Sequence, residues 1–184
     1  MKEVRKERRD KFFGFLFAMT KIPTKEECFQ ILKDNNVPDN IIAHSRQVCD
    51  VAMKIAGLLE HKGIKVNRDL AAAGALLHDV EKLSPNDHVV EGFEMIKSIG
   101  YAEVAQVIKR HGLAHLKDDD FVPKAWEEKI VFYADKRFRG DKIVCVDERF
   151  EYIKQRYKKE DVENEIEFTK KIEKELLGNQ TTLP

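Results

Sequence analysis

Hydrophobic periodicity typical of α-helices runs along almost the whole chain, and this pattern constrains the fold more than any other feature. Apolar residues recur at three- and four-residue intervals, whereas no segment has the alternation or the β-branched run of a convincing strand. Helix-start signals precede these segments: Thr24 with Glu27 forms a capping box, Pro38 occupies a first-turn position, and Asn67 precedes another segment. The pattern predicts an all-α fold, a single-domain helical bundle.

Eight helical segments are expected, and several of them end at a glycine. They cover residues 24–36, 38–63, 67–82, 87–100, 101–112, 123–138, 146–159 and 161–178.

The ends of the chain are expected to flank one central domain. Residues 1–36 are predicted to be a helical extension packed on the domain of residues 37–157, and residues 158–184 a C-terminal helix and tail. The apolar run from Phe12 to Met19 is too short for a membrane span and lacks a following cleavage site, so a docked or interfacial helix is expected. Residues 1–18 could also be a lineage-specific extension, because Met19 would make a natural start.

The composition excludes some classes of partner. With 184 residues the chain suits one domain, and 33 basic against 33 acidic residues give no overall attraction to nucleic acid or anionic membranes. No motif supports binding to a nucleic-acid duplex. The cysteines, Cys28, Cys49 and Cys145, are odd in number and far apart, which indicates buried thiols in a reducing cytoplasm.

Histidines and aspartates on several helices point toward one core. His44 and His111 continue apolar stripes, Asp135 follows Val131 by one helical turn, and His78-Asp79 follows a face of small residues that lets another helix approach closely. A single buried histidine or aspartate is more often a core group or a cap than a ligand. Several such groups would share one explanation if they bound one or two divalent metals. Imidazole and carboxylate donors without thiolates favour Fe, Mn, Ni, Co or Zn.

These residues also carry a resemblance. His44, then His78-Asp79, then Asp135 resemble the H…HD…D signature of the HD-domain metal-dependent phosphohydrolases, over about residues 37–157. With His88 and His111 added, the pattern is similar to the HDIG-like subgroup with H…HD…H…H…D. The resemblance implies that His44, His78, Asp79 and Asp135 hold a first metal. It further implies that Asp79 bridges to a second metal bound by His88 and His111, and that this bridging group is catalytic.

Basic residues near the ligands are candidates for binding phosphate. Lys82 lies about one turn beyond His78, and the resemblance to the HDxxK form of the family implies that it contacts substrate phosphate and takes part in catalysis. That form argues against the family's 5′-nucleotidase branch. Further substrate-binding candidates are Arg110, His115, Lys136 and Arg137.

The leading functional hypothesis is a metal-dependent phosphohydrolase that uses a metal-activated water. Its substrate would be a nucleotide or another small phosphoester or phosphoanhydride. Two alternatives stay open: a di-iron oxygenase of the HD type, which uses the same ligands, and a non-catalytic, metal-stabilised regulatory or binding module. A cytoplasmic location and the absence of a membrane span are expected, and a homodimer is left open.

Overall fold

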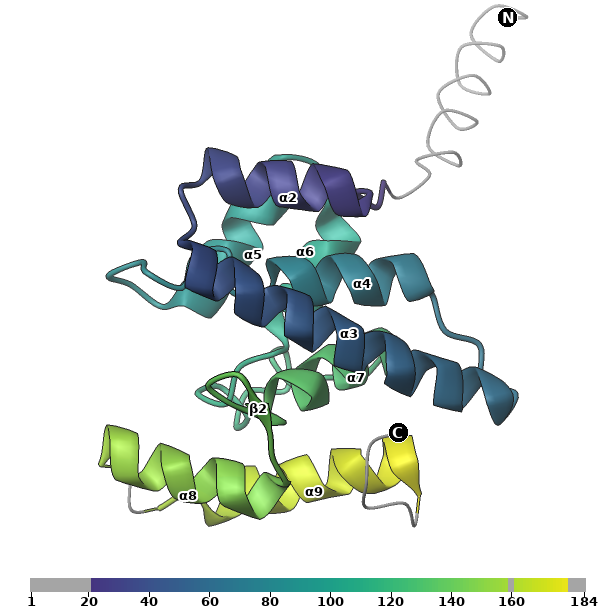
Figure 1. Ribbon diagram of the computed structural model, residues 1–184, viewed down its shortest axis with the longest axis vertical. Coiled ribbons are helices and arrows are strands. Elements are labelled where there is room, and N and C mark those ends of the chain that lie inside the picture. The colour runs from purple at the N-terminus through teal and green to yellow at the C-terminus, as the bar shows by residue number, and fades with distance from the viewer. Residues whose placement is uncertain (1–20, 159–160, 179–184) are drawn as a thin grey trace, which may run out of the picture.

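The computed structural model describes residues 21–158 and 161–178. The expected segment Phe12–Met19 lies outside these residues. Within them the chain forms eight helices and one two-stranded sheet, so the all-α class is confirmed (Figure 1). The elements are α2 (Lys25–Asp34), α3 (Asp39–His61), α4 (Arg68–Leu77), α5 (His88–Ser98), α6 (Ala102–Lys109), α7 (Trp126–Asp135), β1 (Phe138–Arg139), β2 (Lys142–Ile143), α8 (Val146–Tyr157) and α9 (Glu163–Leu177).

Side chains cap three helices at the starts that the sequence indicates. Thr24 and Glu27 form the expected capping box, with each side chain accepting a hydrogen bond from the backbone N–H of the other residue, at 3.2 and 2.8 Å. Asn67 accepts from the N–H of Leu70 at 3.1 Å at the start of α4. Asp87 accepts from the N–H of Val89 at 2.9 Å at the start of α5. These bonds satisfy N–H groups that a helix leaves unpaired.

The helix expected over residues 67–82 is shorter than predicted, because α4 ends at Leu77. The backbone continues in turns in which the N–H of Val80 bonds to the carbonyl of Leu77 and the N–H of Lys82 to that of Asp79, both at 3.0 Å. These bonds span three residues, whereas an α-helix uses four. The His-Asp pair therefore lies just after a helix, in a tighter backbone conformation.

A short hairpin interrupts the helical pattern where no strand was expected. Phe138 pairs with Ile143 and Arg139 with Lys142 in an antiparallel register, and Gly140, with a φ of +62°, lies in the connecting turn. Each strand has two residues, too few for alternation to be recognised. Helix α7 therefore ends at Asp135, before the hairpin, although the sequence predicted a helix up to residue 138.

The helices pack in layers around α4, which contacts α2, α3, α6 and α7. In Figure 1, α2 lies at the top, α3 and α4 cross the middle, and α8 with α9 form the bottom layer. An added Cβ at Gly74 would lie 2.5 Å from Cγ1 of Val107, so α4 and α6 approach closely at this glycine. This contact confirms the close approach expected at the small-residue face before the His-Asp pair.

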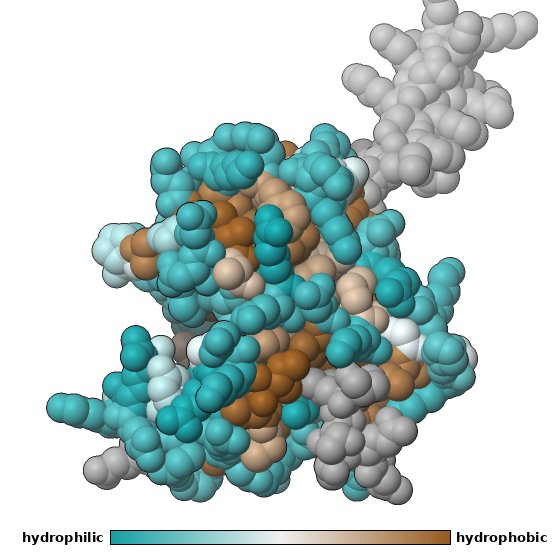
Figure 2. Space-filling view, in the orientation of Figure 1, coloured by the Kyte–Doolittle hydropathy of each residue, from teal (hydrophilic) through white to brown (hydrophobic). Residues whose placement is uncertain are grey.

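The core is built from large apolar side chains, whereas most of the surface in the view of Figure 2 is hydrophilic. Among the largest fully buried side chains are Leu32, Ile55, Leu76, Ile108, Ile130 and Phe132. In the part of the chain that the structure describes, no helix has the length and apolar character needed to cross a membrane.

Candidate metal centre

Two groups of three side chains converge at the centre of the bundle and share one carboxylate. His44, His78 and Asp79 form one group, and Asp79, His88 and His111 form the other. Within each group the donor atoms lie within 4.8 Å of one another. The groups combine residues from α3, the end of α4, the start of α5 and the segment after α6, so only the folded chain assembles them.

His78 presents an unpaired nitrogen to this cluster. Its Nδ1 lies 2.8 Å from the carbonyl of Ala75, which fixes the proton on Nδ1 of the neutral ring, while Nε2 is buried and has no hydrogen-bond partner. Nε2 lies 3.5 Å from Oδ2 of Asp79 and 3.7 Å from Oδ1 of Asp135. Two donors each about 2.1 Å from one ion lie about 3–3.6 Å apart. The residues therefore fit a divalent metal better than a direct hydrogen bond.

His111 is held in the same way on the other side of Asp79. Its Nδ1 lies 2.6 Å from the carbonyl of Ile108, and its Nε2 lies 3.5 Å from Oδ1 of Asp79. His88 completes this group, with Nε2 3.6 Å from the same oxygen and 31% of its side chain exposed. Asp87 supplies the cap of α5, so the His88 side chain is not used for capping. Each oxygen of Asp79 thus faces a different group.

Asp135, the last residue of α7, lies beside the first group. Its Oδ1 is 3.1 Å from Nε2 of His44, and its Oδ2 accepts a hydrogen bond from Nζ of Lys136 at 2.5 Å. Lys136 is buried and also donates to the carbonyl of His111 at 2.8 Å. Lys136 therefore ties the end of α7 to the segment after α6 and orients the Asp135 carboxylate.

Electrostatics favour ionised carboxylates in this cluster. Burial alone would raise the pKa of Asp79, but the charge of His78 and the contacts with His111 and Lys82 hold it well below its usual range. For Asp135, burial is likewise outweighed, chiefly by the charge of Lys136, and the pKa is lowered. Metal ligands must be deprotonated, so both carboxylates are in the binding form at neutral pH.

The pKa values of three histidines in the cluster are shifted in different directions. Burial, then the charges of Lys82 and His111, lower the pKa of His88 to about 4, and burial lowers that of His111. For His78, burial acts in the same direction but is outweighed by Asp79 and Asp135, so its pKa is raised. The two aspartates beside His78 therefore offset the effect of burial on its pKa.

Lys82 lies at the edge of the cluster, where its Nζ is 3.2 Å from Oδ1 of Asp79. Its side chain is 43% exposed, so the ammonium group can also contact a bound molecule. Burial opposes its charge, but Asp79 and Asp135 raise its pKa overall. Lys82 is therefore a cation next to the shared carboxylate.

The other predicted substrate-binding residues are engaged elsewhere. Arg110 pairs with Glu128 at 2.6 Å, and His115 lies 2.6 Å from Oδ2 of Asp87. Arg137 donates to the carbonyl of Val144 at 2.6 Å and to the hydroxyl of Tyr133. These three side chains and that of Lys136 are not among the residues that line the cavity of about 550 Å³ next to the cluster. The structure gives them contacts within the protein, and substrate binding by them stays a prediction.

A cavity of about 550 Å³ opens beside the cluster. His44, Asp79, Lys82 and Asp135 line one side of it. The lining also includes residues of α8 that were not selected from the sequence: Arg149, Tyr152, Arg156 and Tyr157. The sequence does place positions 149, 152 and 156 on one face of a helix. That face could not be recognised as part of the site without knowing which helix borders the cluster.

The family profile described as HD domain matches residues 41–145, more than half of the chain. This range contains all six residues of the H…HD…H…H…D pattern. No solved structure is significantly similar to the chain.

Three curated relatives illustrate the range of named functions. A tRNA (cytidine(56)-2′-O)-methyltransferase of Picrophilus torridus is 35% identical over 67% of this chain and 38% of its own length. An uncharacterised protein of Methanocaldococcus jannaschii is 32% identical over 67% of this chain and 80% of its own length. A dihydroneopterin 2′,3′-cyclic phosphate phosphodiesterase of the same organism is 32% identical over 52% of this chain and 45% of its own length.

This chain thus covers less than half the length of the two relatives with a named activity. The phosphodiesterase relative and the profile together support a metal-dependent phosphohydrolase as the general class. Because the profile matches more than half of the chain and includes the residues of the His/Asp cluster, the chain belongs to the HD-domain family.

Proposed function

We propose that the chain is a phosphohydrolase that binds two divalent metal ions and hydrolyses a small phosphorylated substrate, with nucleotides and cyclic phosphodiesters as the first classes to test. The observation that carries this proposal is the sharing of Asp79 by two His/Asp groups. A carboxylate with one oxygen toward each group is suited to bridging two ions.

The donor types narrow the choice of metal. Neither group of the described cluster contains a thiolate, since Cys28 and Cys49 are not among its members and Cys145 is exposed elsewhere. Imidazole and carboxylate donors suit Fe, Mn, Co, Ni or Zn. We infer His44, His78, Asp79 and Asp135 as ligands of the first ion, and Asp79, His88 and His111 as ligands of the second.

The protein's own groups would then orient and neutralise the substrate. Ions held in this cluster would supply a water of lowered pKa and would offset charge on phosphoryl oxygens. Lys82 would add a positive charge at the edge of the cluster, next to Asp79. Lys136 would hold the Asp135 carboxylate in position through its hydrogen bond to Oδ2. The cavity beside the cluster would hold the rest of the substrate.

One of the relatives supports this class of reaction by its name. The phosphodiesterase relative acts, by its name, on a 2′,3′-cyclic phosphate, which is a small phosphodiester. We do not extend methyl transfer to this chain, because a cluster of His and Asp donors suits a metal that activates water for hydrolysis. A cyclic phosphodiester is therefore the first substrate type to test.

The proposal is tested by a hydrolysis screen on protein purified without oxygen and loaded separately with each candidate metal. We expect hydrolysis of nucleoside 2′,3′-cyclic phosphates or of phosphomonoesters with at least one metal, and none by the Asp79→Asn protein. A fully loaded protein that hydrolyses none of them would contradict the proposal. Oxygen consumption with the spectrum of a mixed-valent iron pair would favour the oxygenase alternative.

A further inference from the structure

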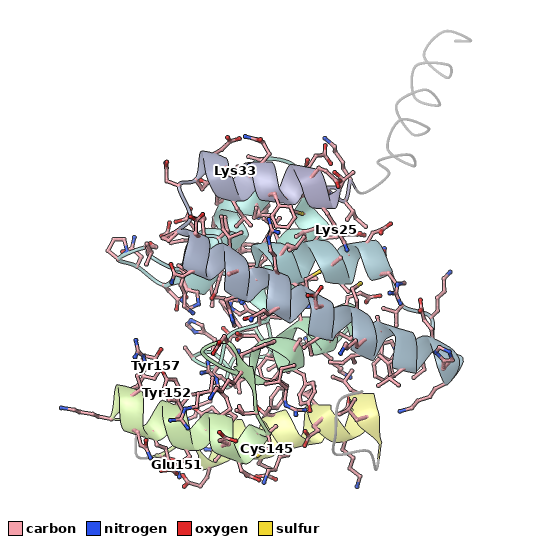
Figure 3. The ribbon with its side chains drawn as sticks, viewed as in Figure 1. Lys25, Lys33, Cys145, Glu151, Tyr152 and Tyr157 are labelled. Atoms are coloured by element: carbon pink, nitrogen blue, oxygen red, sulfur yellow. The ribbon has the colours of Figure 1, made fainter. Side chains whose placement is uncertain are left out.

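Helix α8 forms a wall of the cavity that faces the metal centre but supplies none of its proposed ligands. Figure 3 shows Tyr152 and Tyr157 on the side of α8 directed toward the body of the protein. Arg149 and Arg156 line the same cavity, so the wall combines two aromatic rings with two guanidinium groups. We define these four residues as the α8 wall.

Arg149 is one of the residues that line this cavity. Its Nε is buried and has no hydrogen-bond partner in the described residues, and no ion pair with a described acidic side chain is found for it. A guanidinium group without an acidic partner is well matched to the phosphate oxygens of a molecule in the cavity.

Tyr152 is the centre of a positively charged cluster. The guanidinium carbons of Arg139, Arg149 and Arg156 lie 5.3, 5.6 and 6.0 Å from the centroid of its ring. These distances allow cation–π attraction, which helps to hold the ring in place. Arg139 has a neighbouring acid in Glu148, at 3.7 Å. A held ring flanked by cations suits the binding of a planar, anionic molecule.

Tyr157 adds a second aromatic surface. The residue is 63% exposed and borders a cavity lined by polar and charged groups. The carboxylates that line the cavity are those of Asp79 and Asp135 at the metal centre and Asp141 in the hairpin. The α8 wall itself contributes no acidic residue to it. Exposed rings next to cations are a common means of binding nucleobases and similar heterocycles.

We propose that the α8 wall selects substrates that carry an aromatic heterocycle close to the phosphoryl group. Tyr152 and Tyr157 stack on the heterocycle, and Arg149 binds a phosphoryl oxygen. This inference takes one point from the proposed function, namely that the phosphoryl group of the substrate lies at the metal ions. The cavity of about 550 Å³ is in the size range of sites for small molecules.

The test compares two cyclic phosphodiesters that differ in the heterocycle. Adenosine 2′,3′-cyclic phosphate has one, and glycerol 1,2-cyclic phosphate has the same five-membered ester ring without it. We expect wild-type protein to favour the adenosine compound in kcat/KM. Tyr152→Ala should reduce this preference about tenfold, the scale of one stacked base, and Tyr152→Phe should preserve it.

Arg149→Gln should lower kcat/KM for both compounds by a similar factor, about tenfold or more, and leave the preference unchanged. Lys154→Gln is the matched control, since Lys154 is on α8, pairs with Glu163 and does not line the cavity. It should change neither value. An unchanged preference in Tyr152→Ala, with a melting temperature like that of wild type, would overturn the stacking role.

A binding measurement separates this inference from the proposed function. Metal-loaded protein is titrated with adenosine 5′-monophosphate and with ribose 5-phosphate by calorimetry. If the protein prefers the adenosine compound and Tyr152→Ala loses the preference, the α8 wall selects heterocycles even when no ester is hydrolysed. If hydrolysis occurs but wild-type protein binds and turns over both members of each pair equally, the inference fails and the proposed function stands.

Discussion

The Oδ1 atom of Asp79 lies 3.5 Å from Nε2 of His111, although 32 positions separate the two residues in the sequence. No hydrogen bond of ordinary length joins these atoms, and the Nδ1 atom of the imidazole is occupied by the carbonyl of Ile108. The carboxylate and the imidazole thus face each other across a gap of the size that a metal ion fills. The predictions on metal content below follow from this gap.

Replacement of His111 by glutamine should remove one ion and leave the other. His111 contributes only to the group with His88 and Asp79, whereas the group with His44 and His78 stays complete. Metal analysis after dialysis should find about half the wild-type content, and His88→Gln should give the same result. Full metal content in both variants would contradict the assignment of these histidines.

Replacement of Lys82 by alanine should impair turnover without loss of metal. The ammonium group lies at the edge of the cluster and is not among the grouped donors. A charge-assisted hydrogen bond is worth about 1.5–3 kcal/mol, so kcat/KM should fall about 10- to 100-fold. Steady-state kinetics and metal analysis of the same preparation measure both quantities. Loss of metal would show that Lys82 instead holds Asp79 in place.

Much of the fold and the convergence of the candidate ligands could be predicted from the sequence. Capping residues such as Thr24 and Asn67 specify helix starts locally, because each bonds to backbone groups three residues away. The inward positions of His44 and His111 follow from their apolar neighbours at helical spacing. The resemblance added His88, whose place at the start of a helix gave no such signal.

The α8 wall and the turn after α4 could not be predicted in this way. Arg149 and Tyr152 are on an amphipathic helix, and which side of it borders the metal centre depends on how the hairpin of residues 138–143 redirects the chain. The end of α4 at Leu77 was missed because no glycine or proline follows it before Pro85 to mark the end of a helix. Tertiary contacts decide both features.

Replacement of Gly74 by alanine should destabilise the protein. The new Cβ would lie 2.5 Å from Cγ1 of Val107, so α4 and α6 would have to separate. Such overpacking costs about 1–3 kcal/mol in the free energy of unfolding, which denaturant titration can measure. Gly57→Ala is the control, since its Cβ would meet nothing closer than 3.8 Å and alanine favours a helix. Equal stability of the two variants would contradict the packing described.

Thiol reactivity should differ sharply between the cysteines. Cys145 is exposed, whereas Cys28 and Cys49 are buried in the core. Burial, together with the nearby Cys49, raises the pKa of Cys28 to about 12, so the reactive thiolate is scarce at neutral pH. Mass spectrometry after brief alkylation of the folded protein should find Cys145 modified first. Earlier modification of Cys28 would contradict the position of α2 in the fold.

The metal content of the Asp79→Asn protein tests the central claim most directly. Asp79 belongs to both groups of candidate ligands, and a neutral amide cannot replace the charge of a bridging carboxylate. Asp118→Asn is a matched control, because Asp118 is exposed and lies in the loop between α6 and α7. Native mass spectrometry with metal titration should find two ions bound to wild-type and control proteins and neither bound stably to Asp79→Asn. Two ions retained by a folded Asp79→Asn protein would contradict the shared-carboxylate centre.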